Sequence, residues 1–290
     1  MSGFSRLLDL PPRQTAQYLR YNLTGRSRLA AFDDEHPCVF VLSTGRAGTR
    51  TLAAFFGLAD NVFAYHEPSP TLYALSRLGY ELASDAGARE LLRQAFLEAR
   101  DPILSHSLRC GKGYIETSPQ ATFLGPVIAD AIPGVRFIHL VRDPRDVARS
   151  AMRRNWYGGH ANDKTRIVPL ESSPVARQWA SYSAFRKNVW LWQETNTWIA
   201  RVCADLPPER VLLVHSEDFF QGKAETAAQL MNFVGAPRPR PGEVRTFVGK
   251  RLNAQQTGVF PEPSRWPEEM RRDVAEIAGP MARALGYEVM

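Results

Sequence analysis

The sequence predicts an α/β fold in which short strands alternate with helices. Five apolar, β-prone runs are separated by stretches whose apolar residues recur at helical spacing, and this alternation is typical of strand–helix–strand units. The runs cover residues 38–42, 61–65, 113–116, 135–141 and 210–215. A chain of 290 residues can bury a substantial core. We therefore expect one large domain, residues 36–290, preceded by an N-terminal extension, residues 1–35.

Composition excludes several classes of protein. The 36 Lys and Arg exceed the 30 Asp and Glu, which suits an anionic ligand, but the arginines are scattered, so we do not expect nucleic acid as a partner. The three cysteines, Cys38, Cys110 and Cys203, have no C-x-x-C spacing, so neither a disulfide framework nor a zinc site is indicated. Because the chain has no run of eighteen apolar residues, we expect no transmembrane segment and a cytoplasmic location. The oligomeric state stays open.

The strand of residues 38–42 leads into a loop suited to binding phosphate. Gly45 and Gly48 let the backbone curl so that successive N–H groups point inward, and the helix expected after the loop adds partial positive charge at its N-terminus. Arg46 and Arg50 add two permanent cations. The loop departs from the pattern G-x-x-x-x-G-K-[ST], because Thr49 stands where the lysine belongs. Binding of one phosphate, or of a nucleotide without Mg²⁺, is therefore favoured over ATP hydrolysis.

Helices are expected on both sides of the first loop. In the extension, Asp9 and Pro11 predict a helix that starts near Pro12 and packs on the domain. Further along, helical spacing predicts helices over 71–81, 88–100 and 120–131. In the first two of these, we expect the following residues to face the core: Leu72, Leu75, Leu78, Leu82, Leu91, Leu92, Ala95 and Phe96.

A second basic strand–loop–helix unit begins with the strand of residues 135–141. Asp143 is suited to cap a helix that runs through residues 147–153, Pro144 fits its first position, and Asp146 stands where the acid of a capping box would. The spacing of Arg142 and Ser150 lets both reach one anion on the same side of the sheet.

The last third of the chain combines a long loop with further helices. Residues 154–173 lack periodicity, which predicts a lid or substrate loop, with a disordered surface loop as the alternative. The remaining expectations are a long helix over 174–204 with an aromatic stripe toward the core, an acidic turn at 216–218, a helix over 226–234, a basic loop within 247–261, and an amphipathic helix over 267–285.

Together, the two basic units resemble the sulfotransferases that use 3′-phosphoadenosine 5′-phosphosulfate (PAPS). Ser43-Thr-Gly-Arg-Ala-Gly-Thr-Arg-Thr-Leu52 resembles that family's 5′-phosphosulfate loop, and Leu140-Val-Arg-Asp-Pro-Arg-Asp-Val-Ala-Arg-Ser150 resembles its 3′-phosphate motif. The two stand in the family's order. The resemblance continues more weakly through Val214-His-Ser-Glu-Asp-Phe219 to the basic loop at Lys250, and covers roughly residues 38–258.

The resemblance implies a three-layer α/β/α fold with a central parallel sheet, related to the P-loop nucleotide kinases. It also implies a nucleotide site without metal, which takes PAPS and leaves the product PAP. Carried over by position, its residues are Arg46, Ala47, Gly48, Thr49, Arg50, Thr51, Arg142, Ser150, Lys250 and Arg251. Many cytosolic members have lysine where this chain has Arg46, and arginine there resembles the carbohydrate-type members. The resemblance therefore favours a carbohydrate or other small-molecule hydroxyl as the acceptor.

Sulfuryl transfer in line from a phosphate to a hydroxyl needs a cation at the leaving group and a general base at the acceptor. Arg46 would serve the leaving group. Glu67 is the preferred base, because it ends the second strand beside the loop and its Glu-Pro pair resembles that of carbohydrate sulfotransferases. His66 is the alternative, because the ordinary pKa of histidine lies nearer neutrality; Glu116 and His106 rank after it.

Two other functions remain open on the sequence. A P-loop kinase or nucleotide hydrolase would need Mg²⁺ held by a strand-end acid, for which Asp143 is the obvious candidate, although its capping role and Pro144 argue against this. A nucleotide-binding module without catalysis is the second alternative.

Overall fold

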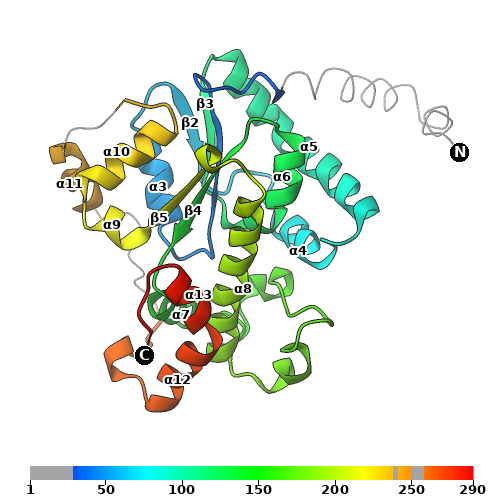
Figure 1. The fold of residues 1–290 in the computed structure, drawn as a ribbon, viewed down its shortest axis with the longest axis vertical. Coiled ribbons are helices and arrows are strands. Elements are labelled where there is room, and N and C mark those ends of the chain that lie inside the picture. Colours follow the sequence, from blue (N-terminus) through cyan, green and yellow to red (C-terminus); the bar gives the residue numbers. More distant parts are fainter. Residues whose placement is uncertain (1–28, 238–240, 250–257, 290) are drawn as a thin grey trace, which may run out of the picture.

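The computed structural model describes residues 29–237, 241–249 and 258–289. At the centre of this part of the chain lies a parallel sheet of five strands, in the order β2-β3-β1-β4-β5 (Figure 1). The strands are β1 (Cys38–Leu42), β2 (Val62–Tyr65), β3 (Gly113–Glu116), β4 (Arg136–Val141) and β5 (Val211–His215). All five coincide with predicted runs to within one residue at each end. The parallel arrangement places their carboxyl ends at one edge of the sheet.

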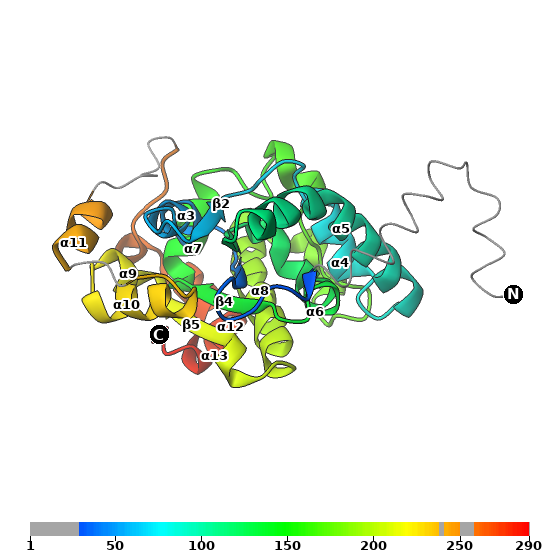
Figure 2. The ribbon, with the colours of Figure 1, turned by 90° about the horizontal axis from the view of Figure 1, so that it is seen from above.

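Helices cover both faces of the sheet (Figures 1 and 2). Successive side chains of β1 enter different cores, as the period of two in a strand requires. Phe40 and Leu42 pack with residues of α5, α6 and α8, whereas Val39 and Val41 pack with residues of α3, α10 and α11. The predicted three-layer α/β/α fold with a central parallel sheet is therefore confirmed.

The helices that make these layers and the lower part of the molecule in Figure 1 have the following bounds: α3 (Thr49–Phe56), α4 (Tyr73–Glu81), α5 (Ala86–Arg109), α6 (Gly125–Ala131), α7 (Pro144–Met152), α8 (Ala184–Ala204), α9 (Ser216–Phe220), α10 (Ala224–Phe233), α11 (Pro241–Gly249), α12 (Glu268–Ile277) and α13 (Gly279–Ala284). Short 3₁₀ turns lie at Pro119–Leu124, Ala161–Thr165, Ala176–Ser181, Pro208–Arg210 and Pro263–Arg265.

Three predicted helices are wrong in their extent. The helix expected over 174–204 is a 3₁₀ turn followed by α8, which starts where the Ser183 hydroxyl accepts a hydrogen bond from the Arg186 amide (3.2 Å). The helix expected over 120–131 is a 3₁₀ turn followed by α6, and that expected over 267–285 is α12 followed by α13. Pro126 and Pro280 lie in the first turn of α6 and of α13, where the missing N–H of proline allows a helix to start but not to continue from the preceding turn.

The predicted inward faces of α4 and α5 are correct only in part. Leu92 and Phe96 are buried, but Leu78, Leu82 and Leu91 are 41%, 37% and 72% exposed, and Ala95 is exposed as well. In α5 two arginines take inward positions, and the fully buried Arg100 forms an ion pair with Glu116. The predicted aromatic stripe is correct within α8, where Phe185, Val189, Trp192 and Ile199 are buried, but Trp179 and Tyr182 are only half-buried and precede the helix.

The remaining predictions from the sequence have these outcomes. The acidic stretch 216–218 is the first turn of α9 rather than a loop. Cys38, Cys110 and Cys203 are free cysteines. The helix expected near Pro12 lies outside the described residues. Among the described residues, no helix is long and apolar enough to cross a membrane.

Candidate active site

The loop between β1 and α3 has the shape of an anion cradle. Gly45 (φ 74°), Arg46 (φ 60°) and Gly48 (φ 96°) all adopt left-handed backbone conformations, which curl the chain tightly before α3. In the described part of the chain no side chain caps α3, so its first amides remain available to a ligand. The loop is anchored at its base, where Thr122 exchanges two hydrogen bonds of 3.0 Å with the backbone of Ser43.

The second basic unit forms a well-capped helix start. Asp143 accepts a hydrogen bond from the Arg145 amide (2.8 Å), and Pro144 is the first residue of α7, as predicted. The capping box expected with Asp146 is wrong. Asp146 instead forms an ion pair with Arg142 (2.7 Å), and the Asp143 amide donates to the Glu217 carboxylate (2.9 Å).

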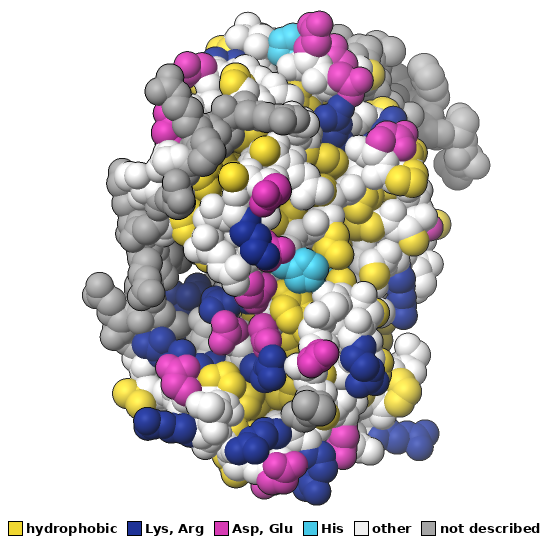
Figure 3. Space-filling view, turned by 60° about the vertical axis from the view of Figure 1, so that its left-hand side comes forward, with side chains coloured by type: hydrophobic (Ala, Val, Ile, Leu, Met, Phe, Trp, Pro, Cys, Tyr) yellow, Lys and Arg dark blue, Asp and Glu magenta, His cyan; other side chains and the backbone are white. Residues whose placement is uncertain are grey.

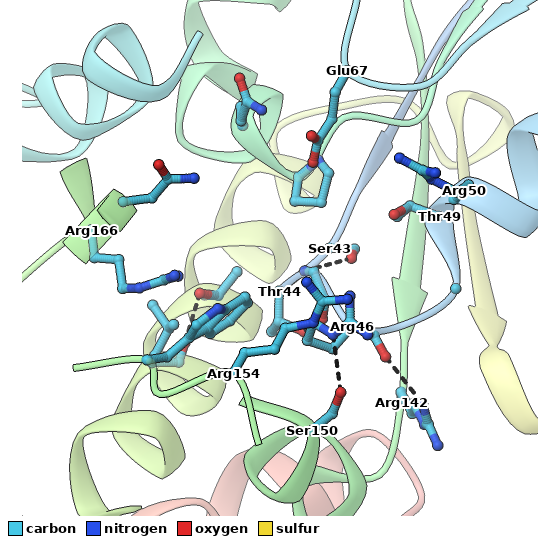
Figure 4. Close-up of a pocket in the computed structure, with 18 of the residues that line it drawn as sticks. Ser43, Thr44, Arg46, Thr49, Arg50, Glu67, Arg142, Ser150, Arg154 and Arg166 are labelled. Atoms are coloured by element: carbon cyan, nitrogen blue, oxygen red, sulfur yellow. Dashed lines mark hydrogen bonds between the residues drawn. The ribbon is translucent and has the colours of Figure 1, made fainter. Parts of the chain in front are cut away.

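The two units meet at one cavity of about 1040 Å³, although they are about ninety residues apart in the sequence. The Arg46 Nε donates to the Ser150 hydroxyl (3.0 Å), and Arg142 Nη1 donates to the carbonyl of Arg46 (3.1 Å), as Figure 4 shows. The predicted position of Arg142 and Ser150 on the same side of the sheet is confirmed. Of the loop residues carried over by the resemblance, Arg46, Gly48, Thr49, Arg50 and Thr51 line this cavity, and the side chain of Ala47 is buried.

Both candidate bases lie at the same cavity. His66 and Glu67 follow β2 at the carboxyl edge of the sheet, and Glu67 points toward the loop in Figure 4. The His66 Nδ1 lies 3.0 Å from the carbonyl oxygen of Thr117, and in the neutral tautomer that donates this hydrogen bond Nε2 is an acceptor. Burial, together with the negative charge of Glu67, raises the pKa of Tyr73, which lies beside Glu67.

The two lower-ranked candidate bases do not line the cavity. Glu116 is fully buried and accepts hydrogen bonds from Arg100 (2.7 and 3.0 Å) and from the Tyr114 hydroxyl (2.7 Å). His106 is an exposed residue near the end of α5 whose ring stacks on Phe63. Glu116 is thus committed to a buried network.

The cavity is strongly basic, and most of its arginines were missed by sequence reasoning. Arg77, Arg149, Arg153, Arg154 and Arg166 line it in addition to those predicted. Burial, with the positive charges of Arg154 and Arg142, lowers the pKa of Arg46 to about 10. The helical spacing of four between Ser150 and Arg154 is the sequence signal that points to one of them. On the surface that faces the viewer in Figure 3, by contrast, acidic and basic side chains are interspersed.

The stretch 154–173 is an ordered wall of the cavity. Asp163 accepts hydrogen bonds from the amides of Tyr157 (3.1 Å), Gly159 (3.0 Å) and His160 (2.9 Å), and from Arg166 Nε (2.8 Å). These bonds tie the stretch together around the 3₁₀ turn. A movement of this wall as a lid stays a prediction.

Two further predictions concern the nucleotide. Lys250 and Arg251 lie outside the described residues. In the part of the chain that the structure describes, no group of three or more His, Cys, Asp or Glu side chains could hold a metal ion. Asp143, the candidate Mg²⁺ ligand of a kinase, is engaged with the α7 cap and with the Arg145 guanidinium (2.6 Å).

Comparison with known proteins identifies the family. The sequence model described as "Sulfotransferase family" matches residues 37–240, which include β1 to β5 and both basic units. The chain belongs to the sulfotransferase family. A sulfotransferase is a transferase enzyme, and the family predicted from the two motifs is thereby confirmed.

Similar proteins agree with this assignment. The protein-tyrosine sulfotransferase of Drosophila melanogaster is 20% identical over 301 residues, which cover 95% of this chain and 56% of that protein. This sulfotransferase thus spans about half the length of that curated relative. A sulfotransferase structure from Mycobacterium avium has a TM-score of 0.52 at 10% identity, covering 99% of this chain and 87% of its own. The sulfotransferase domain from the curacin biosynthetic pathway has a TM-score of 0.51 at 15% identity, covering 88% and 99%. These two structures share the fold.

Proposed function

We propose that this sulfotransferase transfers a sulfuryl group from PAPS to an acceptor hydroxyl without a bound metal. One observation carries the proposal: two anion-binding units from distant parts of the sequence open into one cavity, joined by the Arg46–Ser150 and Arg142–Arg46 hydrogen bonds. A ligand with phosphates at both ends of one nucleoside matches such a pair of sites.

The residues present fit the donor. The amides of residues 47–51, with the Thr49 and Thr51 hydroxyls, would hold the 5′-phosphate, because the start of α3 has no side-chain cap to compete for them. Arg142 and Ser150 would hold the 3′-phosphate. Arg142 uses only part of its five N–H groups on Asp146 and the Arg46 carbonyl, so donors remain for an anion. Lys250 and Arg251 are proposed as further contacts to this phosphate.

The transfer itself needs one proton acceptor. The acceptor hydroxyl gives its proton to the Glu67 carboxylate while its oxygen bonds to sulfur. The bond between sulfur and the bridging phosphate oxygen breaks, and its electron pair stays on that oxygen. Arg46 would stabilise the charge that develops there, and positioning with charge stabilisation would supply most of the acceleration. His66 is the alternative base, because its Nε2 is left as an acceptor.

We propose a carbohydrate or other small-molecule hydroxyl as the acceptor. Trp156 lines the cavity, and the Arg166 guanidinium covers one face of its ring (3.7 Å from the centroid), so a sugar would stack on the other face. Tyr157 is unavailable for this role, because its hydroxyl donates to the Ile167 carbonyl (2.7 Å) and it does not line the cavity. A second candidate is the phenolic hydroxyl of a protein tyrosine, favoured by the similarity to the Drosophila enzyme over 95% of this chain.

Calorimetric titration with PAP, in buffer containing EDTA, tests the donor. We expect PAP to bind without metal and adenosine 5′-monophosphate, which lacks the 3′-phosphate, to bind at least about tenfold more weakly. A requirement for Mg²⁺ and ATP would favour a kinase instead, and failure of all three nucleotides to bind would favour a module without catalysis. A screen with labelled PAPS against sugars and tyrosine peptides then separates the two acceptor classes.

A further inference from the structure

A buried ion pair lies next to the point where β2 ends. Arg100 of α5 and Glu116 of β3 are both fully buried, and Glu116 pairs in the sheet with Tyr65, the last residue of β2. The guanidinium donates two hydrogen bonds to the carboxylate (2.7 and 3.0 Å), and the Tyr114 hydroxyl donates another (2.7 Å). Replacing a buried ion pair by apolar side chains is often neutral for stability, so stability alone does not account for this network.

The Arg100 side chain also reaches the chain that follows β2. We call residues 66–72, which connect β2 to α4, the base segment, because it carries both candidate bases. The Arg100 Nη1 donates to the carbonyl of Pro70 (2.8 Å), three residues beyond Glu67. Glu116 holds the Nε and Nη2 of the same planar guanidinium, so the direction of Nη1 is fixed.

The two ends of the base segment are held from the same side. At the first end, the His66 Nδ1 lies 3.0 Å from the Thr117 carbonyl oxygen. At the other end, the Leu72 amide donates to the Gln120 side-chain oxygen (2.6 Å). Both partners follow β3 directly in the sequence, as the carboxylate that orients Arg100 ends it. The base segment is therefore fixed against β3 and the turn after it, with Arg100 holding its interior.

The backbone of Glu67 requires such support. Its left-handed conformation (φ 49°) persists in a non-glycine residue only where the surrounding structure holds it. Figure 4 shows the Glu67 side chain pointing toward the loop between β1 and α3. Without the contact to Pro70, the base segment would be able to relax toward a negative φ, which would turn the carboxylate away from the acceptor hydroxyl.

We propose that Arg100 is a positioning residue for sulfuryl transfer, which holds the base segment through the Pro70 carbonyl while Glu116 orients its guanidinium. This inference rests on the proposed function, because it assumes that the base segment supplies the proton acceptor. Arg100 and Glu116 are not among the described residues that line the cavity, so they act through the segment and not on the substrate.

An apolar replacement of the network tests this role without leaving a charge buried. Arg100→Met, Glu116→Leu and Tyr114→Phe are combined in one triple variant. Turnover is measured with labelled PAPS and the sugar or tyrosine peptide that reacts fastest in the acceptor screen. We expect kcat to fall by about 10²-fold, because a displacement of about 1 Å at the reacting groups costs this much. PAP affinity should stay within twofold, since the loops that hold the nucleotide are not part of the network.

A second arginine of α5 provides the matched control. Arg89 makes the same two kinds of contact, to the Asp130 carboxylate and to a proline carbonyl, and neither it nor Asp130 is among the described residues that line the cavity. Arg89→Met combined with Asp130→Leu should therefore leave kcat within twofold of the wild type.

The triple variant is also made in the Glu67→Gln background, which separates positioning from general damage. If the network acts through Glu67, removal of the carboxylate leaves nothing to position, so kcat should fall less than twofold further. A further loss of about 10²-fold would show a merely structural role and overturn the inference. If His66→Gln proves the more damaging single variant, the same comparison is made in that background, because His66 lies on the same segment.

The other outcomes are distinct. Unchanged kcat in the triple variant would overturn the inference. If the wild type bound no PAP and transferred sulfuryl to no acceptor in the screen, the proposed function itself would fail. Thermal unfolding shows whether the triple variant folds. If it does not, Arg100→Lys replaces it: the charge beside Glu116 is kept, but an ammonium does not reproduce the guanidinium fork, so kcat should fall about tenfold in the wild type and less than twofold in Glu67→Gln. Equal losses in the two backgrounds would again overturn the inference.

Discussion

Glu67 combines a reactive carboxylate with an unusual backbone. Its φ of 49° lies in the left-handed region, which costs a non-glycine residue about 1–3 kcal/mol. The residue follows β2 directly, so the sheet holds the carboxylate at the cavity. This placement agrees with the proposed role of Glu67 as the base that takes the proton of the acceptor hydroxyl.

Replacing Glu67 by Gln keeps the shape of the side chain and removes its ability to take a proton. We expect turnover with labelled PAPS to fall by about 10²- to 10⁴-fold. PAP affinity should stay within twofold, because Glu67 is not expected to touch the nucleotide. The matched variant His66→Gln should lose much less turnover. The reverse ranking would make His66 the base.

Gly48 is held where an added methyl group would displace the ring of Phe220. A Cβ at this position would lie 2.5 Å from ring atoms of Phe220, and the φ of 96° disfavours any other residue. We expect Gly48→Ala to cost about 1–2 kcal/mol of unfolding free energy and to weaken PAP by distorting the loop. Urea unfolding and calorimetry measure both effects.

Gly242 in α11 provides the control for Gly48. Among the described residues beyond its chain neighbours and its own helix, no atom lies within 4 Å of the position that an added methyl group would take, so Gly242→Ala should stabilise the protein by about 0.4–1 kcal/mol. If both substitutions had the same effect, the special geometry of Gly48 would not matter.

Residues that follow strands were predictable from sequence, whereas residues of the irregular wall were not. Arg142, Ser150 and Arg46 stand in motifs whose spacing fixes their direction relative to a strand end. Arg166 belongs to a stretch without periodicity, and its placement depends on its hydrogen bond to Asp163. Glu116 shows the opposite case: a residue that follows the pattern of a strand-end acid but is not at the site. Its carboxylate points into the core, where it forms an ion pair with the buried Arg100.

At the scale of elements, β4 and α8 meet through a buried polar pair. The His139 Nε2 lies 2.8 Å from the Asn196 side-chain oxygen, and Asn196 in turn donates to the Trp192 carbonyl (2.7 Å). Burial lowers the pKa of His139 to about 4, a change that Asn196 partly offsets and His215 increases. His139 is therefore neutral in the folded protein at neutral pH.

This depressed pKa predicts loss of stability in acid. Because the folded pKa lies below that of the unfolded chain, the stabilising contribution is present above about pH 6.5 and is lost as the pH falls toward 4. The expected loss from this residue is about 3 kcal/mol between pH 7 and pH 4. Urea unfolding at several pH values measures it. His139→Leu should be less stable throughout but should have a shallower slope, and an equal slope would contradict the assignment.

Strands were easier to predict than helices for a physical reason. The strands of a buried parallel sheet are continuous apolar runs, which the sequence shows directly. Helix ends depend on caps and on proline: Ser183 starts α8 about ten residues later than the apolar spacing suggests. Which helical leucines face the core depends on the neighbouring elements, as the exposed Leu91 illustrates.

At the scale of the whole molecule, strand order creates the site. β1 pairs with β3 on one side and with β4 on the other, and the chain leaves β1 toward β2 but leaves β4 toward β5. The loops after β1 and β4 therefore diverge at a switch point, and ligands of open α/β sheets bind at such crevices. This adjacency brings together two motifs that lie about ninety residues apart.

The first described residues belong to the main core. Leu29 and Phe32 are 1% and 3% exposed and pack with residues of β1, β3 and β4, and Asp34 forms an ion pair with Arg136 of β4. The boundary predicted at residue 36 stays a prediction, but these contacts favour a domain that begins at or before Leu29.

Two truncated chains test the boundary, one lacking residues 1–28 and the other lacking residues 1–35. Their difference isolates residues 29–35, whatever residues 1–28 contribute. Removal of a buried leucine or phenylalanine side chain costs about 2–5 kcal/mol, so the shorter chain should be less stable than the longer by at least about 4 kcal/mol in urea unfolding. Leu29→Ala with Phe32→Ala in the full chain should reproduce most of this loss. Equal stability of the two truncated chains would instead place the start of the domain at residue 36, because the segment would then add nothing to the core that it contacts.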